Sequence, residues 1–248
     1  MRKFLLSASA VVGILGATSL AAAAPADTGG LAGKGSFFIS AERIFGLQIQ
    51  SATQESTTGT VTTKSTDSRT DFGLLVGNPN AGPYNIPQLG FDFAVIDGLT
   101  VGGAIGFWVG SSKEKTESGG TTVENTGPSN NAFKISPRVG YIIGLNDSMG
   151  IWLRGGFTFF TAGTSSERTT GGVVTKSTSS TNGFALNLEP GFVLMVNQHF
   201  GFGANINVDI PLTGKFKTES TSGATTTSRE FDLKQMNFGL SFGIIGKI

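Results

Sequence analysis

The feature that most constrains this chain is an alternation of apolar residues with small or polar ones, which recurs in eight segments. Near the C-terminus, Phe238, Leu240 and Phe242 share one parity. Asn237 and Ser241 share the other. Side chains two residues apart lie on one face of a β-strand, whereas in a helix side chains return to the same face after about 3.6 residues. The pattern therefore predicts an all-β fold with strands over residues 36–50, 88–96, 99–110, 132–145, 151–161, 183–196, 201–213 and 235–248.

The two faces of these strands differ in a way that favours a membrane barrel over a soluble sheet. Gly, Ala, Ser and Asn dominate the second face, and only 14% of the chain is charged. A water-exposed sheet normally carries Lys and Glu freely. Small residues with few charges suit the narrow lumen of an eight-stranded barrel, whose apolar face is then turned to lipid. The alternative is a soluble periplasmic β-sandwich or lipocalin-like binding protein, because a half-buried sheet also alternates.

The connections between the segments alternate between short and long. Residues 96–99, 146–149 and 197–200 read as tight turns, whereas residues 51–87, 111–130, 163–182 and 214–229 are long and rich in Thr, Ser and Gly. This rhythm is typical of outer-membrane barrels, which have short periplasmic turns and longer extracellular loops. Residues 71–77 could form a ninth strand. An odd count would break the rhythm, so we assign them to the first loop.

The N-terminal residues have the form of a secretory signal peptide. Arg2 and Lys3 precede an apolar stretch, and the alanines at 21–24 offer a cleavage site, which we place after Ala23. A transmembrane anchor is the alternative, but the stretch is short for a spanning helix of about 20 residues. The sequence thus predicts a cleaved signal peptide over residues 1–23, a short periplasmic segment over 24–33 and a transmembrane, antiparallel, up-and-down barrel of eight strands over 34–248.

Several charged residues fall on the parity assigned to the lumen. An unpaired charge in a tight polar core costs several kcal/mol. We therefore predict that these side chains form a network of ion pairs that fills the lumen; the alternative is that they line or gate a narrow ion path. Arg43 falls on the apolar parity instead, which suggests a β-bulge in the first strand. The lumen charges are the acids Glu42, Asp92, Glu189 and Asp209 and the bases Lys134, Arg138 and Arg154.

Composition argues against several kinds of chemistry. The chain has no Cys, which excludes disulfides, thiolate metal sites and a Cys nucleophile. It has one His, His199, in a predicted turn, so a cluster of His ligands cannot form. The formal net charge is +1 and no basic block is present, so the sequence lacks a nucleic-acid footprint. We expect no enzyme activity, no cofactor, no metal site and no nucleic-acid partner.

Taken together, these patterns resemble the small outer-membrane β-barrels of the OmpA/OmpX, Opa and OmpW kind over residues 34–248. Residues 136–141 are similar to strand segments of such barrels, and residues 237–248 look like the C-terminal signal read by the barrel-assembly machinery. They depart from it by ending in Ile248 where Phe is commoner. The resemblance implies Sec-type export to a Gram-negative outer membrane, escort by periplasmic chaperones and insertion by that machinery.

The resemblance does not determine a function, because one fold hosts many roles. We expect a monomer in contact with outer-membrane lipid and lipopolysaccharide. The first expectation is a structural, surface-exposed barrel with a side-chain-filled lumen and long extracellular loops. The second is a narrow channel for ions or small hydrophobic solutes. The basic residues near the outer rim form either a solvated rim, which we favour, or contacts to lipopolysaccharide; they are Lys113, Lys115, Lys215, Lys217 and Arg229.

Overall fold

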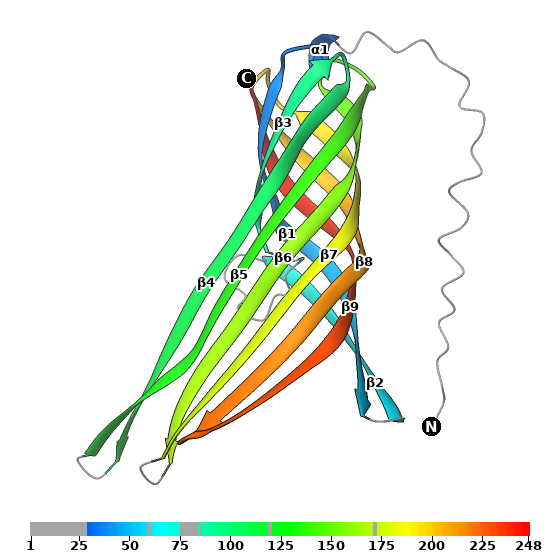
Figure 1. The fold of residues 1–248 in the computed structure, drawn as a ribbon. Coiled ribbons are helices and arrows are strands. Elements are labelled where there is room, and N and C mark those ends of the chain that lie inside the picture. Colours follow the sequence, from blue (N-terminus) through cyan, green and yellow to red (C-terminus); the bar gives the residue numbers. More distant parts are fainter. Residues whose placement is uncertain (1–28, 59–60, 75–83, 85, 119–120, 171–172) are drawn as a thin grey trace, which may run out of the picture.

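The chain folds into one closed β-barrel in a computed structural model, which describes residues 29–58, 61–74, 84, 86–118, 121–170 and 173–248. Figure 1 shows long strands that run obliquely along the barrel. The elements are α1 (Gly29–Ala32), β1 (Phe37–Thr58), β2 (Val61–Leu74), β3 (Gln88–Ile96), β4 (Leu99–Ser118), β5 (Thr121–Gly144), β6 (Met149–Thr170), β7 (Val173–Met195), β8 (Phe200–Ser222) and β9 (Thr225–Lys247).

Eight of these strands close a ring, which confirms the predicted antiparallel up-and-down barrel. The order β1-β3-β4-β5-β6-β7-β8-β9 follows the sequence, and β9 returns to pair with β1. The apolar parity faces outward, where large side chains such as Phe91, Phe93 and Ile105 are exposed. The polar parity faces inward and is buried, as Asn187 and Asn207 are. The arrangement inverts that of a soluble sheet and is the one a lipid environment requires.

β2 is a ninth strand, and it corrects the assignment of residues 51–87 to a loop. It pairs antiparallel with the outer half of β1, from Phe45↔Leu74 to Thr58↔Val61. The inner half of β1 pairs with β3 instead, ending at Glu42↔Gln88. β2 and β3 thus lie one after the other along the same edge of β1, and residues 75–87 separate them in the sequence. Of residues 71–77, predicted as part of the first loop, 71–74 belong to β2, and 75–77 lie outside the described residues.

The other three predicted loops are also wrong, because the strands continue through them. β4 reaches Ser118, β6 reaches Thr170 and β8 reaches Ser222, and each partner strand resumes within three residues. Thr is β-branched and favours strands, and the sequence has glycines, which short hairpin turns favour, at 119–120, 171–172 and 223. These segments carry hydroxyl side chains on both faces, so they show no alternation of apolar with polar residues. The 24 residues of β5 extend about 80 Å at 3.3 Å per residue, far beyond a bilayer of about 30 Å.

The three tight turns form as predicted, at one end of the barrel. Gly98 takes a φ of 78°, a left-handed value that glycine adopts without strain. The Asn146 side chain accepts hydrogen bonds from the backbone of Ser148 and Met149 at 2.9 and 2.8 Å, and Asn197 does the same for the third turn. The C-terminus and α1 lie at this same end, which the short turns mark as periplasmic (Figure 1).

Residues 29–33, predicted as part of a periplasmic segment, enter the barrel mouth. Leu31 and Ala32 are buried against Trp152, Ile142 and Met195. The Gly98 N–H donates to the Ala32 carbonyl at 2.9 Å, which fixes α1 to a turn. The lumen is therefore capped at its periplasmic end by an apolar plug. Residues 1–28, including the predicted signal peptide, lie outside the described residues, and no helix in the described part of the chain is long and apolar enough to cross a membrane.

Candidate functional site

The candidate site is the charged middle of the lumen, and Arg138 stands at its centre. Arg138 projects inward from β5 and is buried. Its Nε and Nη2 donate to the two oxygens of Asp92 at 3.0 and 2.5 Å. Its Nη1 and Nη2 each donate to Glu42 at 2.8 Å, and Nη1 lies 3.3 Å from Glu189. One guanidinium thus joins β1, β3, β5 and β7 through charge-assisted hydrogen bonds, the strong kind.

Arg154 extends the same network across the lumen from β6. Its Nη1 donates to Glu42 at 2.5 Å and its Nη2 lies 3.5 Å from Glu189. Its guanidinium also stacks over the Trp152 ring, 4.6 Å from the centroid. Glu42 receives two further hydrogen bonds of 2.7 Å, from Ser40 and from Gln88. Each oxygen of this buried carboxylate is therefore held by several donors.

Arg43 is the lumen cation that the sequence pattern missed. The register of β1 against β9 shifts between Ala41 and Phe45, and Arg43 takes a φ of 56° within that shift. The predicted bulge is present, and it turns Arg43 from the lipid side into the lumen. There it forms ion pairs with Glu189 and with Asp209, the latter at 3.3 Å. It also donates to the Tyr84 carbonyl at 2.5 Å, and so fixes a residue that lies between β2 and β3 in the sequence.

Asp209 and Lys134 complete the set at the outer side of the network. Asp209 accepts from the amides of Asn187 and Asn237 at 2.8 and 2.9 Å. The Lys134 Nζ donates to the Tyr84 carbonyl at 3.2 Å. All seven predicted lumen residues are buried, and the structure brings six of them together by hydrogen bonds to one another or to Arg43. With Arg43, the described lumen holds four cationic and four anionic side chains, so their formal charges cancel.

An aromatic layer lies beyond the charges, toward the extracellular end. Tyr84, which sequence reasoning did not single out, is buried against Phe160, with ring centroids 5.0 Å apart. Ala185 belongs to the same cluster. From the periplasm outward, the lumen therefore contains the apolar α1 plug, the charged network and this small apolar layer.

Glycines make room for the network, which gives a testable expectation. A Cβ built on Gly90 would lie 2.6 Å from Arg138 Nη2 and 2.8 Å from Glu42 Oε1. Gly155, on another strand, offers a control, because its nearest atoms are at 3.4 and 3.7 Å. We expect Gly90→Ala to lower the free energy of unfolding by about 1–3 kcal/mol, the usual cost of overpacking. Urea unfolding of both variants in lipid vesicles measures the loss, and Gly155→Ala should lower the free energy of unfolding clearly less. Equal losses would mean that Gly90 does not make room for the ion pairs.

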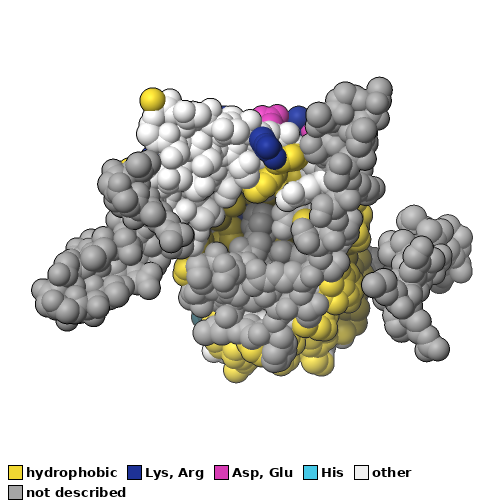
Figure 2. Space-filling model, turned by 90° about the horizontal axis from the view of Figure 1, so that it is seen from below, with side chains coloured by type: hydrophobic (Ala, Val, Ile, Leu, Met, Phe, Trp, Pro, Cys, Tyr) yellow, Lys and Arg dark blue, Asp and Glu magenta, His cyan; other side chains and the backbone are white. Residues whose placement is uncertain are grey.

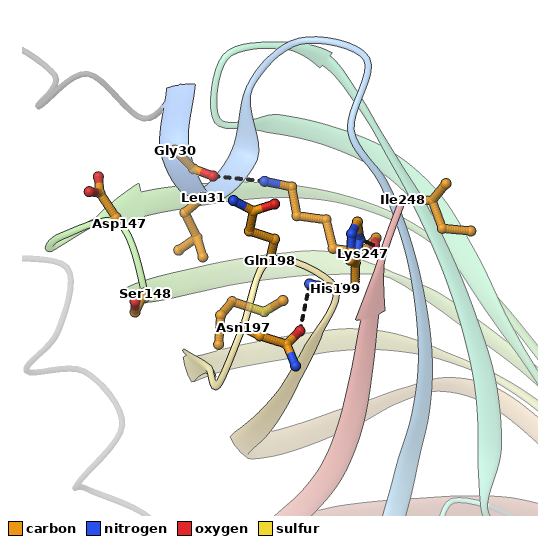
Figure 3. A pocket seen from close by; sticks show the side chains of 10 residues that line it. Gly30, Leu31, Asp147, Ser148, Asn197, Gln198, His199, Lys247 and Ile248 are labelled. Atoms are coloured by element: carbon orange, nitrogen blue, oxygen red, sulfur yellow. Dashed lines mark hydrogen bonds between the residues drawn. The ribbon is translucent and has the colours of Figure 1, made fainter.

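The periplasmic mouth carries a cavity of about 610 Å³ (Figure 3). Lys247 closes one side by donating to the Gly30 carbonyl at 2.7 Å. His199 is exposed in the turn after β7, and its Nδ1 lies 3.1 Å from the Lys247 carbonyl. Among the described residues, no group of three or more His, Cys, Asp or Glu side chains could hold a metal ion. The mouth thus joins α1, two turns and the end of β9.

The basic residues predicted at the outer rim of β8 and β9 lie on different faces of the sheet. Lys215 pairs with Asp232 at 2.8 Å and with Glu230 at 3.3 Å, and Lys217 pairs with Glu219 at 2.7 Å. The hydrogen bond from Lys215 lowers the pKa of Asp232, and that same bond raises the pKa of Lys215. Arg229 lies on the opposite parity of β9 and therefore on the inner face. Side chains of residues 112–118, including Lys113 and Lys115, lie outside the described ones.

A closed antiparallel barrel with an apolar exterior, a charged interior and one end of short turns is a membrane-spanning barrel of the outer-membrane class. No family model matches the sequence, and no curated protein matches it. Solved structures of outer-membrane proteins are similar to it at low identity. OprG of Pseudomonas aeruginosa is 13% identical with a TM-score of 0.48, over 87% of this chain and 97% of that one.

Two further solved structures resemble the chain to a similar degree. A major outer membrane protein of Thermus thermophilus is 13% identical with a TM-score of 0.48, over 82% of this chain and 99% of that one. The outer membrane protein AlkL, solved in DMPC bilayers, is 10% identical with a TM-score of 0.44, over 87% of this chain and 92% of that one.

Proposed function

We propose that this chain is a structural outer-membrane barrel with a sealed lumen, which presents a Ser/Thr-rich β-sheet at the cell surface and catalyses no reaction. The observation that carries the proposal is the neutral set of eight buried charges across the middle of the lumen. An eight-stranded barrel is just wide enough for side chains to fill it. The α1 plug on the periplasmic side of that layer also supports a sealed lumen. The barrel-assembly machinery is the proposed reader of the end of β9.

The test is the ionic current through refolded mature protein in a planar lipid bilayer. Slower gel migration after boiling must first show that the barrel has formed, and a refolded general porin serves as the positive control. We expect no steady conductance from verified barrels at any salt concentration. A stable conductance that rises with salt would contradict the sealed lumen, and it would give Glu42, Arg138 and Glu189 the role of pore lining or gate.

A second candidate, a path for small apolar solutes, has one observation in its favour. In the described part of the chain, β2 pairs only with β1, and β4 beyond Gly106 pairs only with β5. The outer half of the wall therefore has two strand edges without a partner beside the apolar layer of Tyr84 and Phe160. Such a path would lead from the extracellular mouth to lipid and would bypass the charged network.

This candidate is tested by the entry of an uncharged apolar dye into vesicles whose outer leaflet is lipopolysaccharide. A transport role requires faster entry with the protein than without it, and a loss of that gain in Phe160→Asp. A charged dye of similar size should show no gain. Equal entry rates with and without folded protein would exclude the second candidate.

A further inference from the structure

Beyond the membrane, β6 to β9 form a continuous four-stranded sheet whose inner face carries rows of hydroxyl groups. Strand register places one side chain from each strand in each row. Neighbouring strands are about 4.8 Å apart, and successive residues of one face are about 6.7 Å apart. The first row is Thr164, Ser179, Thr218 and Arg229, and the second is Ser166, Ser177, Ser220 and Thr227.

The parity of β9 shows that these rows face the barrel axis. Leu233 is buried, and Phe231 and Arg229 follow it at intervals of two residues toward the extracellular end. Asp232 lies on the other parity and pairs with Lys215 on the outer face. The hydroxyl rows therefore continue the inner wall of the barrel into the extracellular space.

An aromatic pair lies next to the rows on the same face, on the side nearer the membrane. Phe216 and Phe231 are cross-strand partners, with ring centroids 6.2 Å apart and an interplanar angle of 26°. Both side chains are only half-buried. Thr218 and Arg229 are the next inward-facing residues on the same two strands, so rings, hydroxyls and a guanidinium follow one another along the wall.

The rows border a cavity of about 490 Å³ that is open to solvent. Arg229 and Glu219 both line it, and the Glu219 carboxylate is already paired with Lys217. Seen from the extracellular end, the molecule is hollowed, with hydrophobic side chains inside the hollow and a broad area of atoms that are neither hydrophobic nor charged beside it (Figure 2).

We propose that this wall is a binding site for an acidic saccharide. A sugar ring presents an apolar C–H face, which packs on aromatic rings, and a rim of hydroxyls. Ser and Thr hydroxyls both donate and accept hydrogen bonds, so the rows can match sugar hydroxyls in either sense. A carboxylate or phosphate on the sugar would accept a bidentate pair from Arg229. The site stands outside the charged network, so it goes beyond the sealed-barrel proposal and does not depend on it.

The test measures binding to folded protein in phospholipid nanodiscs by NMR of labelled Thr methyl groups. The probes are a disaccharide of glucuronic acid and N-acetylglucosamine and its carboxyl-reduced, neutral form. We expect the acidic probe to shift Thr218 and Thr227 signals and to bind at least fivefold more tightly than the neutral one. Arg229→Gln should remove that preference, and Phe231→Ala should weaken both probes at least fivefold.

Lys215→Gln is the matched control, because it removes a cation from the outer face of the same strand pair, and its partners Glu230 and Asp232 do not line the cavity. It should leave both affinities unchanged. Absence of binding to wild-type protein, or equal effects of Arg229→Gln and Lys215→Gln, would overturn the proposal. Nanodiscs that contain lipopolysaccharide distinguish the source of the saccharide: Thr218 and Thr227 shifts without added probe indicate the cell's own glycolipid, and shifts only with probe indicate an external glycan.

Discussion

Arg138→Ala is expected to lower the free energy of unfolding by about 3–5 kcal/mol, because it removes a buried cation that Asp92, Glu42 and Glu189 share. Arg138 donates to Glu42 and Asp92 and lies 3.3 Å from Glu189, and all four side chains are buried. The barrel should still assemble, since its strand pairing and outer apolar face are unchanged. Urea unfolding in lipid vesicles, followed by tryptophan fluorescence, measures the loss.

Two further variants separate this network effect from a general weakness of the barrel. Lys217→Ala removes an exposed cation and should leave the unfolding midpoint unchanged, because exposed ion pairs contribute little. The double variant Arg138→Ala with Glu189→Ala should lose less than the sum of the single losses, because the two side chains share a network. If Arg138→Ala, Glu189→Ala and the double variant all unfold like wild type, the ion pairs do not stabilise the lumen.

The sequence was sufficient for the wall of the barrel because each membrane-spanning strand has two chemically different faces. Arg138 and Glu189 stand on the parity opposite to exposed residues such as Val139 and Leu188, and a one-residue slip would turn these charges toward lipid. Their placement follows from the pattern alone. Their specific partners do not, since strand register alone does not determine which long side chains meet across a lumen.

Beyond the bilayer the same reasoning fails, because both faces of the strands are wet. On β7, Ser177 belongs to the inner hydroxyl rows and Lys176 lies on the outer face, yet neither face needs apolar residues. Alternation then carries no signal, and low hydrophobicity predicts a loop. The remaining signals were the β-branched character of Thr and the glycines at 119–120, 171–172 and 223, which together predict extended hairpins.

Arg43 shows a different limit, because a bulge exchanges the two faces within one strand. A basic residue on the lipid-facing parity of a spanning strand is costly, by about 2–4 kcal/mol at the midplane. That cost is itself the signal that the backbone departs from regular alternation there. The partner of β1 changes at this same place, from Gln88 of β3 to Leu74 of β2. Neither the burial of Tyr84 in the lumen nor its contact with Arg43 could be predicted from residue spacing.

Replacing Arg43 should therefore have two separable effects. Arg43→Ala removes the cation that joins Glu189, Asp209 and the Tyr84 carbonyl, and we expect it to cost about 3–5 kcal/mol of unfolding free energy. Arg43 is the one non-glycine residue with positive φ in the part of the chain that the structure describes. The left-handed conformation costs an L-residue about 1–2 kcal/mol, so Arg43→Gly should be the more stable of the two variants by about that amount.

The contact with Tyr84 has its own readout, independent of global stability. The chain has two tyrosines, so fluorotyrosine labelling gives two ¹⁹F NMR signals. Tyr84 is buried in the lumen and Tyr141 is exposed on the lipid side, where it serves as an internal reference. In Arg43→Ala and Arg43→Gly, a soluble paramagnetic agent should broaden the Tyr84 signal while Tyr141 is unchanged. If Tyr84 stays protected in both variants, then Phe160 and Lys134 hold it without Arg43, and the bulge in β1 serves only to neutralise Glu189 and Asp209.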